Sequence, residues 1–333
     1  SMTVEHNFSI RRVSNQLTMQ QAYSWARGGE AIAQKALRVD LQMDKDDALT
    51  VDHRGEFWYS AEPQMFPLDE NGNYYAGTLI DLQGRFNINS LRKTAQNIPE
   101  GGIEPEIPFT IEQGIFMRLL QSFNDDDFQI SYDQAKDITE AVVDYLDSDS
   151  NARGFSCGED DAYYSIEDRQ AHKVPNSPLW SVSELRLVCN LPVVLFEKLQ
   201  SQVTVWPSHG NAAININTAS VELLRSIFID SNDVALLKGV NGSKNYLPPP
   251  PVSEETLTEL IERLAGEGYT DFNGIKTDTD GVELWPGAPL GLHSDYFLLI
   301  GEVKLNDLVQ RLYSVISREG GTIQFLARST GGL

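Results

Sequence analysis

The sequence predicts an α+β fold in which a helix and a first set of strands are separated from the last strands by a long, mainly helical insertion. Three observations support this prediction. Apolar residues recur at helical spacing near the N-terminus, strand-like segments occur at residues 55–90 and again after residue 295, and most of the chain between them has a helical pattern. We therefore expect one helix-and-sheet domain that is interrupted in sequence by a second domain.

Residues 15–38 predict the first helix. Mostly small residues recur on one narrow face of it: Ala22, Trp25, Ala26, Gly29, Ile32, Ala33 and Ala36. Such a face suits close packing against a sheet or against another helix. Gly28 and Gly29 weaken the helix in its middle.

Strands are expected at residues 56–59, 74–82 and 85–89, with turn residues at 69–73. The end of the chain predicts further strands at residues 296–300, 302–305 and 322–327, with an apolar stretch at 308–316. These segments complete the expected sheet.

The insertion predicts two blocks of helices. The first block has candidate helices at residues 109–123, 131–146, 181–188 and 191–201, and the second has them at 218–228, 231–238 and 253–266. Four prolines at 248–251 form a stiff connector. The expected domains are residues 1–95, the insertion 96–285 (with blocks at about 105–205 and 215–270) and residues 286–333.

The composition is strongly acidic, with 48 Asp and Glu against 26 Lys and Arg and a formal net charge of −22. This charge disfavours binding to nucleic acid or to anionic lipid and is compatible with divalent cations and basic partners. No stretch approaches the ~20 apolar residues of a membrane-spanning helix. Ser1-Met2 is typical of the remnant of an expression tag, so we expect that the natural N-terminus, with a membrane anchor, is missing.

The chain has two cysteines, Cys157 and Cys189. They fit a disulfide in an oxidising compartment, which would close a loop of roughly 30 residues and contribute about 3 kcal/mol. They fit equally well two free, buried thiols. The spacing alone leaves both possibilities open.

Crowded carboxylates between residues 147 and 161 are the clearest chemical feature of the sequence. Asp147, Asp149 and Asn151 occupy the first three ligand positions of an EF-hand, but Ala152 stands where a glycine is needed, and Gly158 stands where the bidentate glutamate is needed. An irregular calcium loop remains possible, with these ligands: Asp147, Asp149, Glu159 and Asp161. The alternative is a solvated acidic loop, which is the more frequent outcome for an isolated acidic cluster.

Several segments resemble the general secretion pathway protein K family, the largest minor pseudopilin of type II secretion. They are residues 82–91, 144–149, 158–164, 183–188, 214–220, 294–297 and 318–328, and they follow one another in the family's order. The resemblance spans roughly residues 80 to 330. It implies a pilin-like N-terminal helix packed on an antiparallel sheet, with a large α-helical domain inserted between strands.

The resemblance also implies a function. A protein of this family is a non-enzymatic component that caps the pseudopilus tip with minor pseudopilins I and J, above minor pseudopilin H and the major pseudopilin, with the secretin and exoproteins as further contacts. It is anchored in the bacterial inner membrane and has a periplasmic soluble part. Calcium-stabilised loops are known in the family, so the resemblance favours structural Ca²⁺ at the acidic loop. The small-residue face at residues 22–36 is then the expected partner interface.

Two other function classes are disfavoured. Residues 215–224 resemble the opening of a helix-hairpin-helix DNA-binding module, but residues 228–233 lack the glycine hairpin that holds a phosphate. An enzyme is disfavoured because the five histidines have no metal-binding spacing and no nucleophile elbow or glycine-rich phosphate loop occurs. The sequence therefore predicts no catalytic residues and no nucleic-acid partner.

Overall fold

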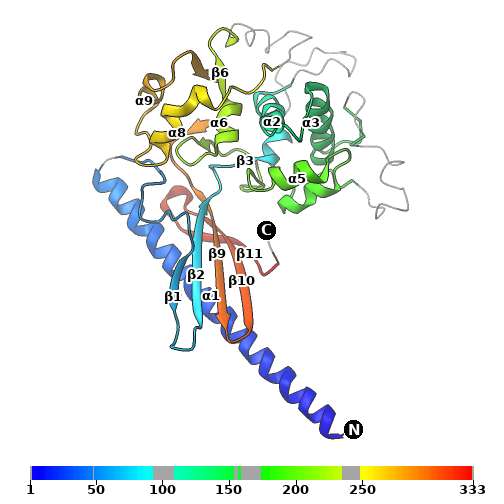
Figure 1. The fold of residues 1–333 in the computed structure, drawn as a ribbon, viewed down its shortest axis with the longest axis vertical. Coiled ribbons are helices and arrows are strands. Elements are labelled where there is room, and N and C mark those ends of the chain that lie inside the picture. Colours follow the sequence, from blue (N-terminus) through cyan, green and yellow to red (C-terminus); the bar gives the residue numbers. More distant parts are fainter. Residues whose placement is uncertain are drawn as a thin grey trace. The chain divides into compact units, whose positions relative to one another are not determined.

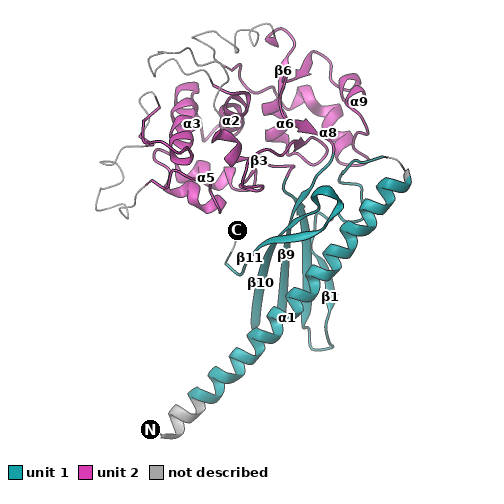
Figure 2. Cartoon of the chain, turned by 180° about the vertical axis from the view of Figure 1, so that it is seen from behind, with its two compact units in different colours: residues 1–82, 293–333 teal, residues 83–292 magenta. Residues whose placement is uncertain are grey.

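The computed structural model describes residues 2–47, 49–92, 109–153, 157–158, 174–234 and 248–331. The chain divides into two compact units, shown in Figure 2: unit 1 is residues 1–82 with 293–333, and unit 2 is residues 83–292. The sequence predicts the changes of domain near residues 95 and 285, whereas the chain leaves unit 1 after Leu82 and returns to it at His293.

Unit 1 is a long helix packed on one antiparallel sheet. The helix α1 (Met2–Asp47) crosses a face of the sheet, and its N-terminal part projects beyond the strands (Figure 1). The strand order is β1-β2-β9-β10-β11. The strands are β1 (Gln64–Pro67), β2 (Tyr74–Asp81), β9 (Tyr296–Leu305), β10 (Leu308–Ser317) and β11 (Gln324–Ser329), and a short 3₁₀ turn, Glu319–Gly321, precedes β11. This is the helix-on-sheet core that the sequence predicts.

Small side chains let α1 approach the sheet closely. Ala22 and Ala26 are buried against Tyr75 of β2 and Val303 of β9. Gly29 lies directly over the ring of Tyr75, because a Cβ atom built on Gly29 would lie 2.0 Å from the Tyr75 hydroxyl oxygen. The absence of a side chain at Gly29 is therefore a packing requirement.

Adjacent glycines in α1 allow a matched test. We expect Gly29→Ala to lower the free energy of unfolding of unit 1 by about 1–3 kcal/mol, because the added methyl group overlaps Tyr75. Gly28→Ala has nothing within 4 Å of its new Cβ and should instead stabilise the helix, by about 0.5–1 kcal/mol. Hydrogen exchange of the β2 and β9 amides measures both effects, and equal effects of the two substitutions would contradict this packing.

The structure differs from the prediction in three parts of unit 1. The helix α1 extends well beyond residues 15–38, because no proline or turn signal interrupts residues 2–47. Residues 56–59 form a turn instead of a strand, because the Glu56 carboxylate accepts hydrogen bonds from the His53 amide and the Trp58 indole. The strand β1 was not predicted, and all four of its residues are exposed.

The described residues of unit 2 form short helices and three two-stranded pairs. Its helices are α2 (Ile111–Ser122), α3 (Tyr132–Leu146), α5 (Val193–Leu199), α6 (Val221–Ile227), α8 (Thr258–Leu264) and α9 (Phe272–Thr277), with 3₁₀ turns at Ile88–Arg92, Val182–Leu187 and Glu255–Leu257. The pairs are β3 (Phe86–Asn87) with β4 (Val203–Thr204), β5 (Ile214–Asn215) with β8 (Leu290–Gly291), and β6 (Phe228–Asp230) with β7 (Val282–Leu284). Of the predicted helix 231–238, only residues 231–234 are described.

Two asparagines in unit 2 have the same structural role. The side-chain amide of Asn89 bonds both backbone polar groups of Leu179, at 2.8 and 3.0 Å. Asn217 bonds the N–H and C=O of Tyr269 in the same way, at 2.8 and 2.9 Å. Each asparagine follows a short parallel strand pair, so unit 2 uses one local arrangement twice. Both asparagines end an Asn-Ile-Asn sequence, at residues 87–89 and 215–217, so the repeated arrangement has a matching sequence pattern.

The helices α2 and α3 begin at capping boxes. Thr110 and Gln113 bond reciprocally at the start of α2, and Ser131 and Gln134 do so at the start of α3. Both helices are largely buried and pack against each other. No helix among the described residues combines the length and apolar character needed to cross a lipid bilayer.

Candidate functional site

The acidic loop begins where α3 ends. Asp147 is the C-cap residue, and its N–H donates to the Val143 carbonyl oxygen at 2.9 Å. The Asp147 carboxylate accepts the N–H of Asp149 at 3.3 Å, and the Asp149 carboxylate accepts that of Asn151 at 2.9 Å. These bonds fold the chain tightly after the end of the helix, and the charges of Asp147 and Asp149 lie close enough to interact.

The charges of this loop are only partly compensated. Burial, and then the neighbouring charge of Asp149, raise the pKa of Asp147 to about 6. The Arg153 guanidinium lies near Asp147, Asp144 and Glu140, whose charges favour its protonated form although burial lowers its pKa. Arg153 thus supplies a positive charge next to the loop.

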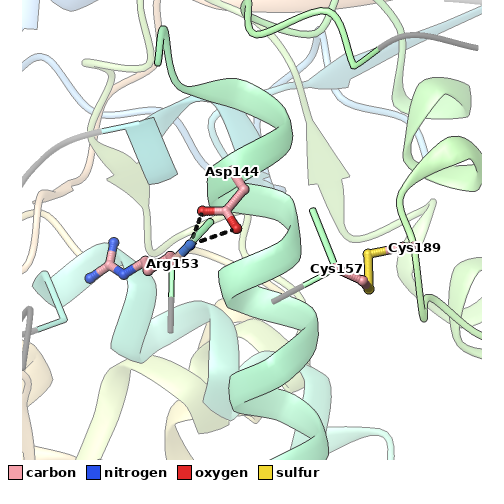
Figure 3. The surroundings of a disulfide bond; sticks show 4 residues. All are labelled: Asp144, Arg153, Cys157 and Cys189. Atoms are coloured by element: carbon pink, nitrogen blue, oxygen red, sulfur yellow. Dashed lines mark hydrogen bonds between the residues drawn. A yellow bond between two sulfur atoms is a disulfide. The ribbon is translucent and has the colours of Figure 1, made fainter. Parts of the chain in front are cut away.

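Asp144 closes the loop onto α3. It is fully buried, and its two carboxylate oxygens accept the backbone N–H of Arg153 at 3.2 and 3.0 Å (Figure 3). Asp144 is not among the site residues that the sequence predicts. The acidic run 144–149 includes Asp144, but its bond to the Arg153 N–H, nine residues later, follows no recognisable sequence pattern.

The structure resolves the question left open by the cysteine spacing. Cys157 and Cys189 form a disulfide with a Cα–Cα distance of 6.1 Å (Figure 3). The following residue, Gly158, lies against α3, where an added Cβ would be 2.5 Å from the Asp144 Cβ and 2.9 Å from the Ala141 carbonyl oxygen. The disulfide therefore holds Gly158 in close contact with α3, the helix that precedes the acidic loop.

The predicted metal ligands are only partly described. Asp147 and Asp149 are described, and the Asp149 N–H donates to the Asp147 carboxylate. Glu159 and Asp161 lie outside the described residues. Within the described part of the chain, no third histidine, cysteine or carboxylate joins Asp147 and Asp149 at metal-binding spacing. The four-ligand calcium site stays a prediction.

The predicted partner face on α1 needs a correction. Four of its seven residues are buried in unit 1 itself: Ala22, Ala26, Gly29 and Ala33. The sheet occupies this side of the helix because small residues permit close approach from any apolar surface. Ala36 is partly buried against the same core, whereas Trp25 and Ile32 expose 46% and 51% of their surface.

Residues 228–233, which stand where a helix-hairpin-helix module has its phosphate-binding glycine hairpin, form a strand and a turn instead. Residues 228–230 form β6, which pairs with β7, and the Asp230 carboxylate accepts the N–H of Asn232 at 2.8 Å. A carboxylate therefore occupies the turn in which a DNA-binding module presents its backbone amides to a phosphate.

Comparison with known proteins gives one consistent family. Residues 84–208 match the family model described as type II secretion system (T2SS), protein K. Type II secretion system protein K of Pseudomonas aeruginosa is 29% identical over 99% of this chain and 86% of that protein. The protein of the same description from Klebsiella pneumoniae is 24% identical over 99% of this chain and 90% of its own length.

A solved structure supports the fold. A chain in the crystal structure of the GspK-GspI-GspJ complex from the type 2 secretion system of enterotoxigenic Escherichia coli superimposes with a TM-score of 0.65 and 24% sequence identity. The match covers 97% of the present chain and 100% of the other. The matched family model and the relatives aligned over nearly the whole sequence all carry one description, type II secretion system protein K, and this is the family that the chain resembles.

Proposed function

We propose that this chain is a minor pseudopilin that assembles with two other minor pseudopilins, I and J, and has no catalytic role. One observation in unit 1 carries the proposal: the helix uses one side for its own sheet and leaves an apolar strip of Trp25, Ile32 and Val39 uncovered. The similar chain of known structure comes from a complex of GspK with GspI and GspJ.

The geometry of the strip suits a partner helix. Trp25, Ile32 and Val39 follow one another at intervals of seven residues. Seven residues make almost two full helical turns, so each side chain is rotated by only about 20° from the previous one and the three form a line along α1. Ile32 and Val39 line a hollow of about 320 Å³ together with Phe57 and Phe66. An apolar line beside a shallow hollow can receive the side chains of a second amphipathic helix.

In the proposed assembly this protein caps the tip of the pseudopilus and nucleates its assembly. Unit 2 is inserted between β2 and β9, and its bulk would block the addition of another pseudopilin above. Minor pseudopilin H and the major pseudopilin would follow below, and the secretin and exoproteins would be further contacts. The native chain would be held in the inner membrane by a segment preceding the present one, with both units in the periplasm.

We expect Ile32→Asp to abolish formation of the ternary complex with I and J, because it places a charge in the centre of the apolar strip. Ala31→Asp is the matched control: it adds the same charge to the neighbouring exposed position, about 100° around the helix. Co-purification measures association, and circular dichroism checks that both variants fold. Unchanged association of Ile32→Asp would contradict this interface.

We also propose that the loop from Asp147 to Asp161 holds a structural calcium ion. Asp147 and Asp149 offer adjacent carboxylates, and the raised pKa of Asp147 reflects buried negative charge that a cation would offset. Oxygen ligands on an irregular loop match the preference of calcium. Such an ion would stabilise the folded unit by its binding free energy.

Removal of calcium tests this second proposal. A chelator should lower the thermal midpoint of the full chain, by an amount equivalent to about 2.7 kcal/mol when calcium had been present at 100 times its Kd. Asp147→Asn should reduce the calcium-dependent part of this shift. Asp126→Asn, an exposed acid elsewhere in unit 2, should leave it unchanged. A shift that is the same in all three proteins would contradict the assignment.

A further inference from the structure

A second acidic cluster lies in unit 1, where the last turns of α1 meet residues 51–58. Asp40 and Asp52 are buried, and one carboxylate oxygen from each of Asp40, Asp52 and Glu56 lies within 4.8 Å of the other two. Asp44, one helical turn after Asp40, is 8% exposed. None of these residues belongs to the acidic loop of unit 2.

Two positively charged or ionisable side chains contact this cluster. Arg318 donates to Asp40 at 2.6 Å and also pairs with Asp52. His293 Nδ1 lies 2.8 Å from the second oxygen of Asp52, and its other nitrogen faces Asp295. With all four acids ionised and both His293 and Arg318 protonated, the cluster has two more negative than positive charges; burial, and then the charges of Asp40 and Asp52, raise the pKa of Glu56 to about 8.

Asp44 provides an independent observation that points to a ligand. Its Oδ2 atom is buried and has no hydrogen-bond partner. The Asp44 carboxylate is close enough to Asp40 and Asp52 for their negative charges to raise its pKa, after burial, to about 6. A buried carboxylate oxygen without a donor or a cation is unfavourable, because it has lost its hydration without replacement.

We propose that Asp40, Asp44, Asp52 and Glu56 form a divalent cation site, with calcium as the best fit. The oxygens of Asp40, Asp52 and Glu56 lie within 4.8 Å of one another, and calcium binds oxygen at about 2.3–2.6 Å in flexible geometry, which suits that spacing. Asp44 would supply a fourth carboxylate from the next turn of α1. The charge of one divalent ion would balance the two excess negative charges of the ionised cluster. The ion would tie the end of α1 to residues 51–58, next to His293, which precedes β9, and Arg318, which directly follows β10.

The test uses the full chain and calcium alone as the ligand. Equilibrium dialysis should show that Asp44→Asn/Glu56→Gln binds one calcium ion fewer per chain than the wild type. Asp46→Asn, on an exposed side of the same helical turn, should bind as the wild type does. The loss should add to that of Asp147→Asn, which separates this site from the loop of unit 2.

Thermal unfolding gives a second readout. In chelator, Asp44→Asn/Glu56→Gln should be at least as stable as the wild type, because it removes like charges, and it should lose a calcium-dependent rise that Asp46→Asn retains. If the double variant does not fold, Asp44→Asn alone removes no hydrogen bond from the Asp44 Oδ2 atom and should weaken binding about tenfold or more. Equal calcium stoichiometry and affinity in the Asp44 variant and the wild type would overturn the proposal.

Discussion

Replacing Arg318 by methionine is expected to lower the free energy of unfolding of unit 1 by about 3–5 kcal/mol. Arg318 is fully buried, and it donates to Asp40, to Asp52 and to the Ser294 carbonyl oxygen. Methionine can fill part of the same space over the Phe297 ring, which lies 4.8 Å from the guanidinium carbon. The loss therefore comes mainly from buried carboxylates that no longer have their cation.

An arginine on the neighbouring part of the sheet provides the control. Arg311 of β10 pairs with Glu302 at 2.8 Å, but its side chain is 57% exposed. Because water screens this pair, Arg311→Met should change stability little. Hydrogen exchange of the β9 and β10 amides, measured in chelator, reports on unit 1 separately from unit 2. Similar losses of stability in Arg318→Met and Arg311→Met would show that burial does not determine how much Arg318 contributes to the stability of unit 1.

The parts of the fold that sequence predicts best are those encoded locally. The helices α2 and α3 lie within the predicted ranges 109–123 and 131–146, because their apolar pattern and capping residues agree. The strands β2 and β9 follow the predicted apolar segments, although 296–300 and 302–305 join into one strand across Gly301. The turn at 69–73 is also confirmed, with Asp69 accepting the Asn71 and Asn73 amides.

Other features depend on contacts that spacing cannot show. The periodicity of α1 identifies Ala22 and Ala26 as one face, but it does not distinguish the protein's own sheet from a partner helix as the surface they meet. The same limit applies to Arg318, which is 278 residues from Asp40 in the sequence. The adjacent acids Asp147 and Asp149 were predictable because their relation is local, whereas the Asp40 cluster required the fold.

Removing the disulfide is the second substitution with a large expected effect. Cys157→Ser/Cys189→Ser should lower the free energy of unfolding of unit 2 by about 3–4 kcal/mol, because the bridge closes a loop between residues 32 positions apart and so restricts the unfolded chain. Hydrogen exchange of the α3 amides measures this loss. Reductant should destabilise the wild type to the same extent and should leave the double serine variant unchanged.

The disulfide also connects the stability of unit 2 to its acidic loop. Gly158, directly after Cys157, packs on Asp144, and Asp144 in turn binds the Arg153 amide beside Asp147. If calcium binds this loop, loss of the bridge should weaken calcium binding, and the effects of the serine pair and of Asp147→Asn should not add. Additive effects in the presence of calcium would show that the bridge acts only on the unfolded chain and does not position the loop.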